Sequence, residues 1–203
     1  SINIAIAGAT GYIGLELIKI LSNHPKAKIL YLCATKSIGK SIDHFDKRIN
    51  KKYLPKITKI EKADWNKIDV LFTALPNGEA HKIVKTLPIK TKLIDLSADF
   101  RLKNPNVYKK WYGNKHKSTK LIPKSIYSIT EFSKKKIGKY KIISCPGCYP
   151  TSIQIPLIPL IKENLINTNN IIVDSKSGYS GAGKNIKKKF KLKYLFDSVR
   201  AYG

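Results

Sequence analysis

Apolar runs with the length of strands alternate along this chain with amphipathic stretches that have the period of a helix. Residues 2–7 read Ile-Asn-Ile-Ala-Ile-Ala and predict a strand, and the pattern predicts a helix over 12–23, ended by His24-Pro25. Further strands are predicted at 28–34, 69–75, 92–96, 141–144 and 171–174, and further helices at 79–87 and 148–164. This alternation predicts the α/β class, with a Rossmann-like, doubly wound parallel sheet.

Two stretches, 36–66 and 102–124, lack a regular pattern and are rich in Lys and Asn, so we expect irregular structure there. The length of 203 residues is enough for one complete domain, or for one domain and part of a second.

Composition narrows the class of protein. With 42% hydrophobic residues the chain can form a core, which excludes disorder as the whole answer. No apolar run approaches the roughly 18 to 20 residues of a membrane span. Ser1 leads directly into the first strand, so no secretory signal is expected. Three cysteines are too few for a disulfide framework, and a cytoplasmic location fits best.

The net charge of +26 comes almost wholly from lysine, because Arg48, Arg101 and Arg200 are the only arginines among 39 basic residues. Nucleic-acid binders cluster their positive charge and use arginine for forked contacts, whereas these lysines are spread along the chain. We therefore expect no nucleic-acid partner and no membrane partner. A basic nucleic-acid-binding protein stays as an alternative, and an attraction for anionic small molecules remains.

A glycine-rich turn, Gly8-Ala9-Thr10-Gly11-Tyr12-Ile13-Gly14, lies where the first strand becomes the first helix. Glycine lets the backbone approach a pyrophosphate closely, and the helix N-terminus offers N–H groups and a positive dipole end. The turn therefore predicts dinucleotide binding, although a strand-to-helix turn without a ligand is the alternative. The predicted contacts are Gly8, Thr10, Gly11, Tyr12, Ile13 and Gly14.

The end of the second predicted strand indicates which dinucleotide is bound. An NAD-preferring fold places Asp or Glu there to hold the ribose 2′-hydroxyl. This chain has Thr35 and Lys36 instead, with no acid before Asp43. A hydroxyl and an ammonium group suit a 2′-phosphate, so the sequence favours NADP.

Cys148 is the candidate nucleophile. In Cys145-Pro146-Gly147-Cys148 it follows a strand and a Pro-Gly turn and begins a predicted helix. The N–H groups and dipole of a helix N-terminus stabilise a thiolate, which is suited to acyl chemistry. The C-x-x-C spacing leaves a redox pair and a metal site as weaker alternatives, but no second Cys or His pair follows at zinc spacing, and no metal is expected. Cys33, and less firmly Cys145, fit a structural role.

Another glycine-rich segment, SGYSGAGK at 177–184, follows the predicted strand at 171–174 and is expected to approach a cofactor or substrate. Together, these segments resemble N-acetyl-gamma-glutamyl-phosphate reductase, a family of arginine biosynthesis related to aspartate-semialdehyde dehydrogenase. The resemblance covers essentially the whole chain. Its landmarks are GATGYIG at 8–14, ALPNGEA at 74–80, DLSADFR at 95–101, WYG at 111–113 with His116 after it, PGCYPT at 146–151 and SGYSGAGK.

The resemblance implies a Rossmann domain over 1–147 that binds NADP, and the start of an α+β substrate domain over 148–203. It implies that Cys148 attacks the acyl phosphate of N-acetyl-glutamyl phosphate, releases phosphate and forms a thioester, which hydride from NADPH reduces to the semialdehyde. Arg101 matches a contact to the substrate phosphate, where a guanidinium fork suits the task. Lys184 is a second expected substrate contact. Further expected cofactor contacts are Ala74, Leu75, Pro76, Ser180 and Gly181.

The sequence departs from the family pattern at several positions. The family usually has Asn at Cys145, His at Asn77 and Arg at Lys184, and YGLPE where 127–131 reads YSITE. The family's GHRHxPE-like segment, which supplies the histidine acid/base, would follow Ala201-Tyr202-Gly203. We therefore expect a fragment with little turnover by itself and a homo-oligomer at full length. The alternatives are an aspartate-semialdehyde dehydrogenase-type enzyme and a non-catalytic NADP-binding module.

Overall fold

A parallel sheet of seven strands is the main feature of the computed structural model, which describes residues 1–49, 53–184 and 199. The chain divides into two compact units, Ser1–Thr151 and Ser152–Gly203, and the sheet belongs to the first. Its strands lie in the order β3-β2-β1-β4-β5-β7-β6. They are β1 (Ile2–Ala7), β2 (Ala27–Cys33), β3 (Ile57–Thr58), β4 (Val70–Thr73), β5 (Lys92–Asp95), β6 (Ser125–Tyr127) and β7 (Ile142–Ser144).

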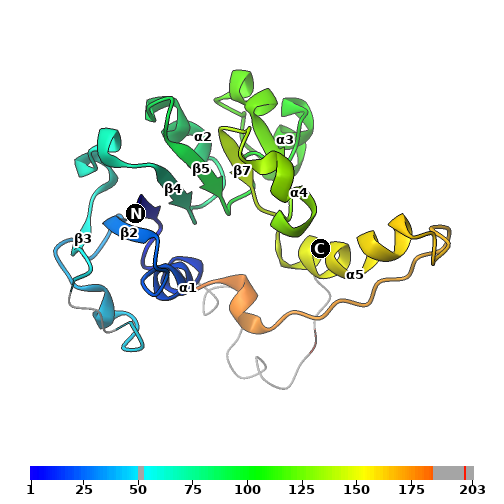
Figure 1. Cartoon of the computed structure of the whole chain (residues 1–203), viewed down its shortest axis with the longest axis horizontal. Helices are drawn as coiled ribbons and strands as arrows, with labels where there is room; N and C mark the ends of the chain where they lie inside the picture. Colours follow the sequence, from blue (N-terminus) through cyan, green and yellow to red (C-terminus); the bar gives the residue numbers. More distant parts are fainter. Residues whose placement is uncertain (50–52, 185–198, 200–203) are drawn as a thin grey trace. The chain divides into compact units, whose positions relative to one another are not determined.

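The strand order confirms the doubly wound topology. From β1 the chain adds β2 and β3 on one side, and then crosses to add β4 and β5 on the other, with every neighbouring pair parallel. Parallel strands need crossover connections, and helices supply several of them. Along the chain α1 connects β1 to β2, α2 connects β4 to β5, α3 connects β5 to β6 and α4 connects β6 to β7, and Figure 1 shows these helices beside the strands of the sheet. These helices are α1 (Tyr12–Leu21), α2 (Ala80–Ile83), α3 (Pro105–Tyr112) and α4 (Thr130–Ile137).

The core consists of two apolar clusters that share strand β1. Ala5 and Ala7 belong to one cluster, which includes Leu71, Leu93 and Ile142 from the neighbouring strands. Ile4 and Ile6 belong to the other, with Ile18 of α1 and Leu32 of β2. Because side chains alternate along a strand, β1 is buried on both faces, as expected for the central strand of a doubly wound sheet.

Helix α3 lies inside a stretch for which we predicted irregular structure, and that prediction was wrong. Asn104 caps the helix by accepting hydrogen bonds from the N–H groups of Asn106 and Val107, and Pro105 occupies the first turn. Gly113 ends it in the left-handed region at φ 73°. These are sequence-readable signals, and the burial of Tyr108 fixes the helix against the sheet unit.

Two other elements differ from expectation. The helix predicted over 79–87 is shorter, because α2 ends at Ile83 and continues as a single 3-10 turn, Val84–Thr86. The strand predicted at 171–174 is wrong, since this segment of the second unit is irregular and Ile172 is 93% exposed. A strand needs a neighbour for its N–H and C=O groups, and the described residues pair none with this segment.

The second unit, Ser152–Gly203, contains most of helix α5 (Cys148–Lys162) and the 3-10 turn η6 (Tyr179–Ala182). Pro156 and Pro159 lie inside α5. Across the described ranges 1–49 and 53–184, no helix combines the length and the apolar character that a bilayer crossing would require.

Candidate functional site

The predicted site residues of the first unit follow the carboxyl ends of β1, β2, β4, β5 and β7. These ends share one edge of the sheet because all the strands are parallel. Backbone hydrogen bonds continue the sheet into the loops: the N–H of Ala74 donates to Ala7 C=O, that of Leu96 to Thr73 C=O and that of Cys145 to Asp95 C=O, at 2.8–2.9 Å. In open α/β sheets this edge holds ligands, next to the point where the strand order reverses. Here that point lies between β1 and β4.

The glycine turn is packed so tightly that two of its glycines admit no side chain. Gly8 has φ +87°, and a Cβ there would lie 2.2 Å from the carbonyl oxygen of Ala74. A Cβ on Gly14 would lie 2.2 Å from the carbonyl oxygen of Gly8. Gly11 differs, since its nearest contact would be 3.4 Å away. The first and third glycines therefore hold the turn together, whereas Gly11 leaves space at the uncapped N-terminus of α1.

The loops beside the glycine turn carry the other predicted dinucleotide contacts of the first unit. The N–H groups of Gly8 and Ala9 donate to Cys33 C=O at 3.0 and 3.1 Å, which ties the turn to the end of β2. Thr35 and Lys36 follow there and are exposed. On the other side, Ala74, Leu75 and Pro76 follow β4, and the Ala74 carbonyl lies against Gly8.

Cys148 is the first residue of α5 and is exposed. The chain enters the helix through Pro146 and Gly147, and the N–H of Thr151 donates to Gly147 C=O at 3.0 Å, which closes the first turn. Cys33 is buried inside β2, as a small structural cysteine would be, and burial raises its pKa to about 12. Cys145 is half-buried, and burial with the nearby Asp95 charge raises its pKa, while Arg101 lowers it.

Arg101 lies over the Cys145–Cys148 turn. Its Nε donates to the carbonyl of Cys145 at 3.0 Å, and its Nη2 donates to the carbonyl of Leu96 at 3.3 Å. Its Nη1 faces Gly147, where an added Cβ would be 3.3 Å away. The guanidinium group thus connects the loop after β5 to the loop before α5 and brings a fixed positive charge to the helix start.

The loop that carries Arg101 is organised by Asp95, which is buried. Its Oδ1 accepts hydrogen bonds from the Thr73 hydroxyl at 2.9 Å, and from the backbone N–H and hydroxyl of Ser97 at 3.0 and 2.6 Å. The pKa of Asp95 is raised, because the effect of burial exceeds that of these hydrogen bonds, which lower it. Its Oδ2 and the Oγ of Ser144, on the paired strand β7, have no hydrogen-bond partner in the part of the chain that is described.

Asp99 joins three separate elements to this loop, and sequence reasoning missed it. Its carboxylate accepts hydrogen bonds from the N–H of Gly78 at 2.7 Å, the N–H of His81 at 3.1 Å and the hydroxyl of Tyr108 at 2.7 Å. The DLSADFR motif could have indicated this role, because an acidic side chain in a loop after a buried strand needs hydrogen-bond donors. Asp99 therefore fixes the loop after β4 against the loop after β5.

Two histidines pack beside Asp99, and both are buried. The His116 Nδ1 accepts from the N–H of Ser118 at 3.2 Å, so its Nε2 carries the proton and donates to Asp99 C=O at 2.9 Å. The His81 ring contacts His116 edge-to-face at 4.9 Å between centroids. Neither His81 nitrogen has a partner among the described residues. Burial lowers the pKa of both histidines, which supports structural roles.

This pair should make the fold sensitive to acid. Unfolded histidines take up protons below about pH 6.5, whereas His81 and His116 resist protonation when folded. The free energy of unfolding should therefore fall as the pH drops below about 6.5, by at most about 1.4 kcal/mol per pH unit for each histidine. Urea unfolding of His81→Leu between pH 7.5 and pH 5 should show a shallower decline. The exposed His44, changed to Leu, should leave the decline unchanged, and an equal decline in all three proteins would contradict the assignment.

Three predicted contacts lie in the second unit. Ser180 and Gly181 belong to η6, and Lys184 follows it, all exposed. A Cβ on Gly181 would lie 2.8 Å from the Ser177 hydroxyl, the end of a side chain that can rotate away. Their roles toward cofactor and substrate stay predictions. The terminal Ala201-Tyr202-Gly203 lies outside the described residues.

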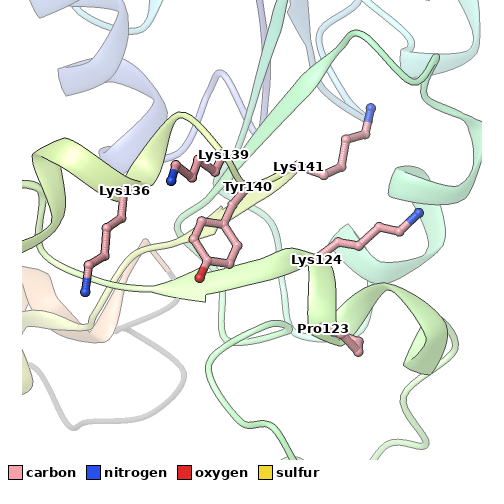
Figure 2. A pocket seen from close by; sticks show the side chains of 6 residues that line it. All are labelled: Pro123, Lys124, Lys136, Lys139, Tyr140 and Lys141. Atoms are coloured by element: carbon pink, nitrogen blue, oxygen red, sulfur yellow. The ribbon is translucent and has the colours of Figure 1, made fainter.

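A lysine-rich hollow of about 460 Å³ lies at the opposite, amino-terminal edge of the sheet, where β6 and β7 begin. Figure 2 shows its lining: Pro123, Lys124, Lys136, Lys139, Tyr140 and Lys141. The Lys141 ammonium donates to the carbonyls of Pro88, Ile89 and Thr91. Burial lowers the pKa of Lys141, and the positive charges of Lys92 and Lys124 lower it further. At least this lysine therefore holds loops together, away from the edge that carries Cys148.

Comparison with known proteins shows that both parts of the chain match domains of the same kind of protein. Residues 3–140 match the family described as semialdehyde dehydrogenase, NAD binding domain, and residues 148–203 match its dimerisation domain. The chain is 45% identical over 202 residues to an N-acetyl-gamma-glutamyl-phosphate reductase of Ehrlichia canis, and 39% identical over 207 residues to one of Rhodospirillum rubrum. The matches cover 99% and 100% of this chain, but only 58% and 59% of those relatives.

Solved structures agree on the fold. An aspartate semialdehyde dehydrogenase II of Vibrio cholerae superposes with a TM-score of 0.64 at 18% identity, over 99% of this chain and 54% of that one. The aspartate semialdehyde dehydrogenase of Candida albicans, solved with NADP, gives 0.53 at 20% identity, over 80% of this chain and 48% of that one.

Proposed function

Because the chain belongs to the semialdehyde dehydrogenase family, we propose that it contributes to the NADPH-dependent reduction of N-acetyl-glutamyl 5-phosphate. The products are N-acetyl-glutamate 5-semialdehyde and phosphate. The observation that carries this proposal is an exposed cysteine at a helix start, on the same sheet edge as a glycine turn in which Gly8 and Gly14 admit no side chain. The chain spans about 58% of the relatives it matches, so the remaining parts of the reaction belong to the whole protein.

The chain's own residues account for the first half of the reaction. The Cys148 thiolate attacks the acyl carbon, the bond to the phosphate oxygen breaks, and phosphate leaves as a thioester forms on sulfur. Arg101 brings positive charge to this position, since its Nη1 faces the turn before Cys148. That charge stabilises the departing phosphate.

The residues of the first unit fit an NADP molecule. Gly11 leaves space at the uncapped start of α1, which suits a pyrophosphate, and Thr35 with Lys36 suits a 2′-phosphate. When bound, NADPH supplies the hydride. We assign the domain boundary to 147/148, and we place Ser180, Gly181 and Lys184 of the second domain at the cofactor and substrate. That domain also carries the dimerisation surface that its family description names.

Cofactor preference provides the test. The 203-residue chain is titrated with NADPH and with NADH while nicotinamide fluorescence is recorded. Lys36→Ser should weaken NADPH binding about tenfold and leave NADH binding unchanged, because only the 2′-phosphate loses its ammonium partner. Lys26→Ser is the matched control, since Lys26 is exposed just before the opposite end of β2. Equal binding of the two cofactors by the unaltered chain would refute the NADP assignment.

A further inference from the structure

The proposed reaction uses Cys148 and gives no role to Cys145, although the two form a C-x-x-C pair. Cys145 follows β7 directly, and Cys148 begins α5, so strand, Cys-Pro-Gly-Cys and helix succeed one another without an intervening residue. Both cysteines belong to the first compact unit. A C-x-x-C pair between a strand and a helix N-terminus is the arrangement of dithiol redox sites.

The two thiols differ in access and in charge. Cys148 is exposed and reachable by a small oxidant, whereas Cys145 is half-buried. Burial and the charge of Asp95 keep Cys145 in its protonated form, although Arg101 opposes them. The third cysteine, Cys33, is 1% exposed inside β2. An oxidant therefore meets Cys148 first, with Cys145 three residues away as the partner.

Arg101 and Asp95 hold the segment from Cys145 to Gly147 in place. Arg101 donates through Nε to the Cys145 carbonyl, and its Nη1 lies against Gly147. The N–H of Cys145 is bonded to Asp95 C=O at 2.8 Å. Cys145 is thus fixed at the sheet edge, and only the start of α5 has to adjust for the sulfur atoms to meet.

We propose that Cys145 and Cys148 form a reversible disulfide under peroxide, and that this bond protects Cys148. The Cys148 thiolate attacks one oxygen of hydrogen peroxide, hydroxide leaves, and a sulfenic acid forms. The Cys145 sulfur then attacks the Cys148 sulfur, the S–O bond of the sulfenic acid breaks, and its hydroxyl group leaves with the Cys145 proton as water. Two thiols are oxidised for each peroxide reduced to two waters, and a dithiol reductant restores both thiols.

The functional consequence rests on the proposed function. In the disulfide Cys148 has no thiolate to attack an acyl phosphate, so the oxidised protein cannot be acylated. Further oxidation to sulfinic acid, which a dithiol does not reverse, is prevented as long as Cys145 captures the sulfenic acid first.

Mass spectrometry of the 203-residue chain tests the proposal. The protein is exposed to hydrogen peroxide, alkylated with iodoacetamide and digested. We expect the loss of two hydrogen masses and a peptide that holds a Cys145–Cys148 disulfide, both reversed by dithiothreitol, whereas Cys33 is alkylated in denatured samples. Cys33→Ser is the matched control and should form the same bond. Cys145→Ser should instead carry a Cys148 oxidised to sulfinic or sulfonic acid that dithiothreitol does not restore.

Some results would overturn the proposal. They are a bond that includes Cys33, a bond between two chains, or wild-type Cys148 that overoxidises as readily as in Cys145→Ser. The readout does not depend on activity. A disulfide in a protein whose reduced form is never acylated would keep the redox chemistry and reject the proposed function.

Discussion

Replacing Cys148 by serine is expected to abolish covalent capture of an acyl phosphate, with a loss of at least about a thousandfold in rate. A serine hydroxyl remains protonated at neutral pH and is a much weaker nucleophile than a thiolate. The cysteine is exposed at the helix start and already accessible. The measurement is the intact mass of the 203-residue chain after brief mixing with N-acetyl-glutamyl phosphate, without cofactor.

The other two cysteines provide the controls for this experiment. Cys33→Ser should be acylated like the wild type, and so should Cys145→Ser under reducing conditions. Aspartyl phosphate, offered in parallel, distinguishes the related chemistry, because the proposed enzyme should prefer the N-acetyl-glutamyl compound. Acylation that survives in Cys148→Ser would place the nucleophile elsewhere.

Replacing Gly14 by alanine is expected to destabilise the first unit by about 3 kcal/mol or more. The added Cβ would lie 2.2 Å from the Gly8 carbonyl oxygen and 2.9 Å from backbone atoms of Ala9. All these atoms belong to the backbone at the end of β1, so relief requires that α1 move away from the sheet. Urea unfolding followed by circular dichroism measures the change in the free energy of unfolding.

Gly11→Ala is the matched control within the same turn. Gly11 has φ −76°, which alanine adopts readily, and its nearest contact would be 3.4 Å away. We expect the free energy of unfolding of this variant to lie within about 1 kcal/mol of that of the wild type. It should nevertheless bind NADPH more weakly, because the new methyl group would occupy the space assigned to the pyrophosphate. Equal stability of the Gly14 and Gly11 variants would show that the packing of the turn is not as described.

The central part of the fold could be predicted from the sequence because its signals are local. Strand β1 was predicted with its observed bounds, since alternation and the glycine turn both mark it. The short strands β3 and β6 were not predicted, because two or three residues form a strand only when a neighbour such as β2 or β7 is present. Helix α3 could have been predicted from its capping residues, which lie in a lysine-rich stretch.

Some features of the candidate site could likewise be predicted from the sequence, and others could not. The position of Cys148 at a helix start follows from a single segment, so the sequence was sufficient. The role of Asp99 depends on Gly78, His81 and Tyr108, which come from other loops and helices. No periodicity along the chain reports which distant donors will converge on one carboxylate. The burial of His81 and His116 could not be predicted either, because the local sequence around a histidine is the same whether its side chain is exposed or enclosed.

The contacts of Arg101 limit what this residue can recognise. Two of its five N–H groups donate to main-chain oxygens of neighbouring loops, so three N–H groups, both of those on Nη1 and one on Nη2, remain for an incoming anion. A guanidinium fork binds phosphates and carboxylates alike, so it does not by itself distinguish a tetrahedral oxyanion from a flat one. Discrimination between a phosphorylated acid and its free carboxylate must therefore come from the chemistry of the leaving group, since only the phosphorylated acid can transfer its acyl group to sulfur.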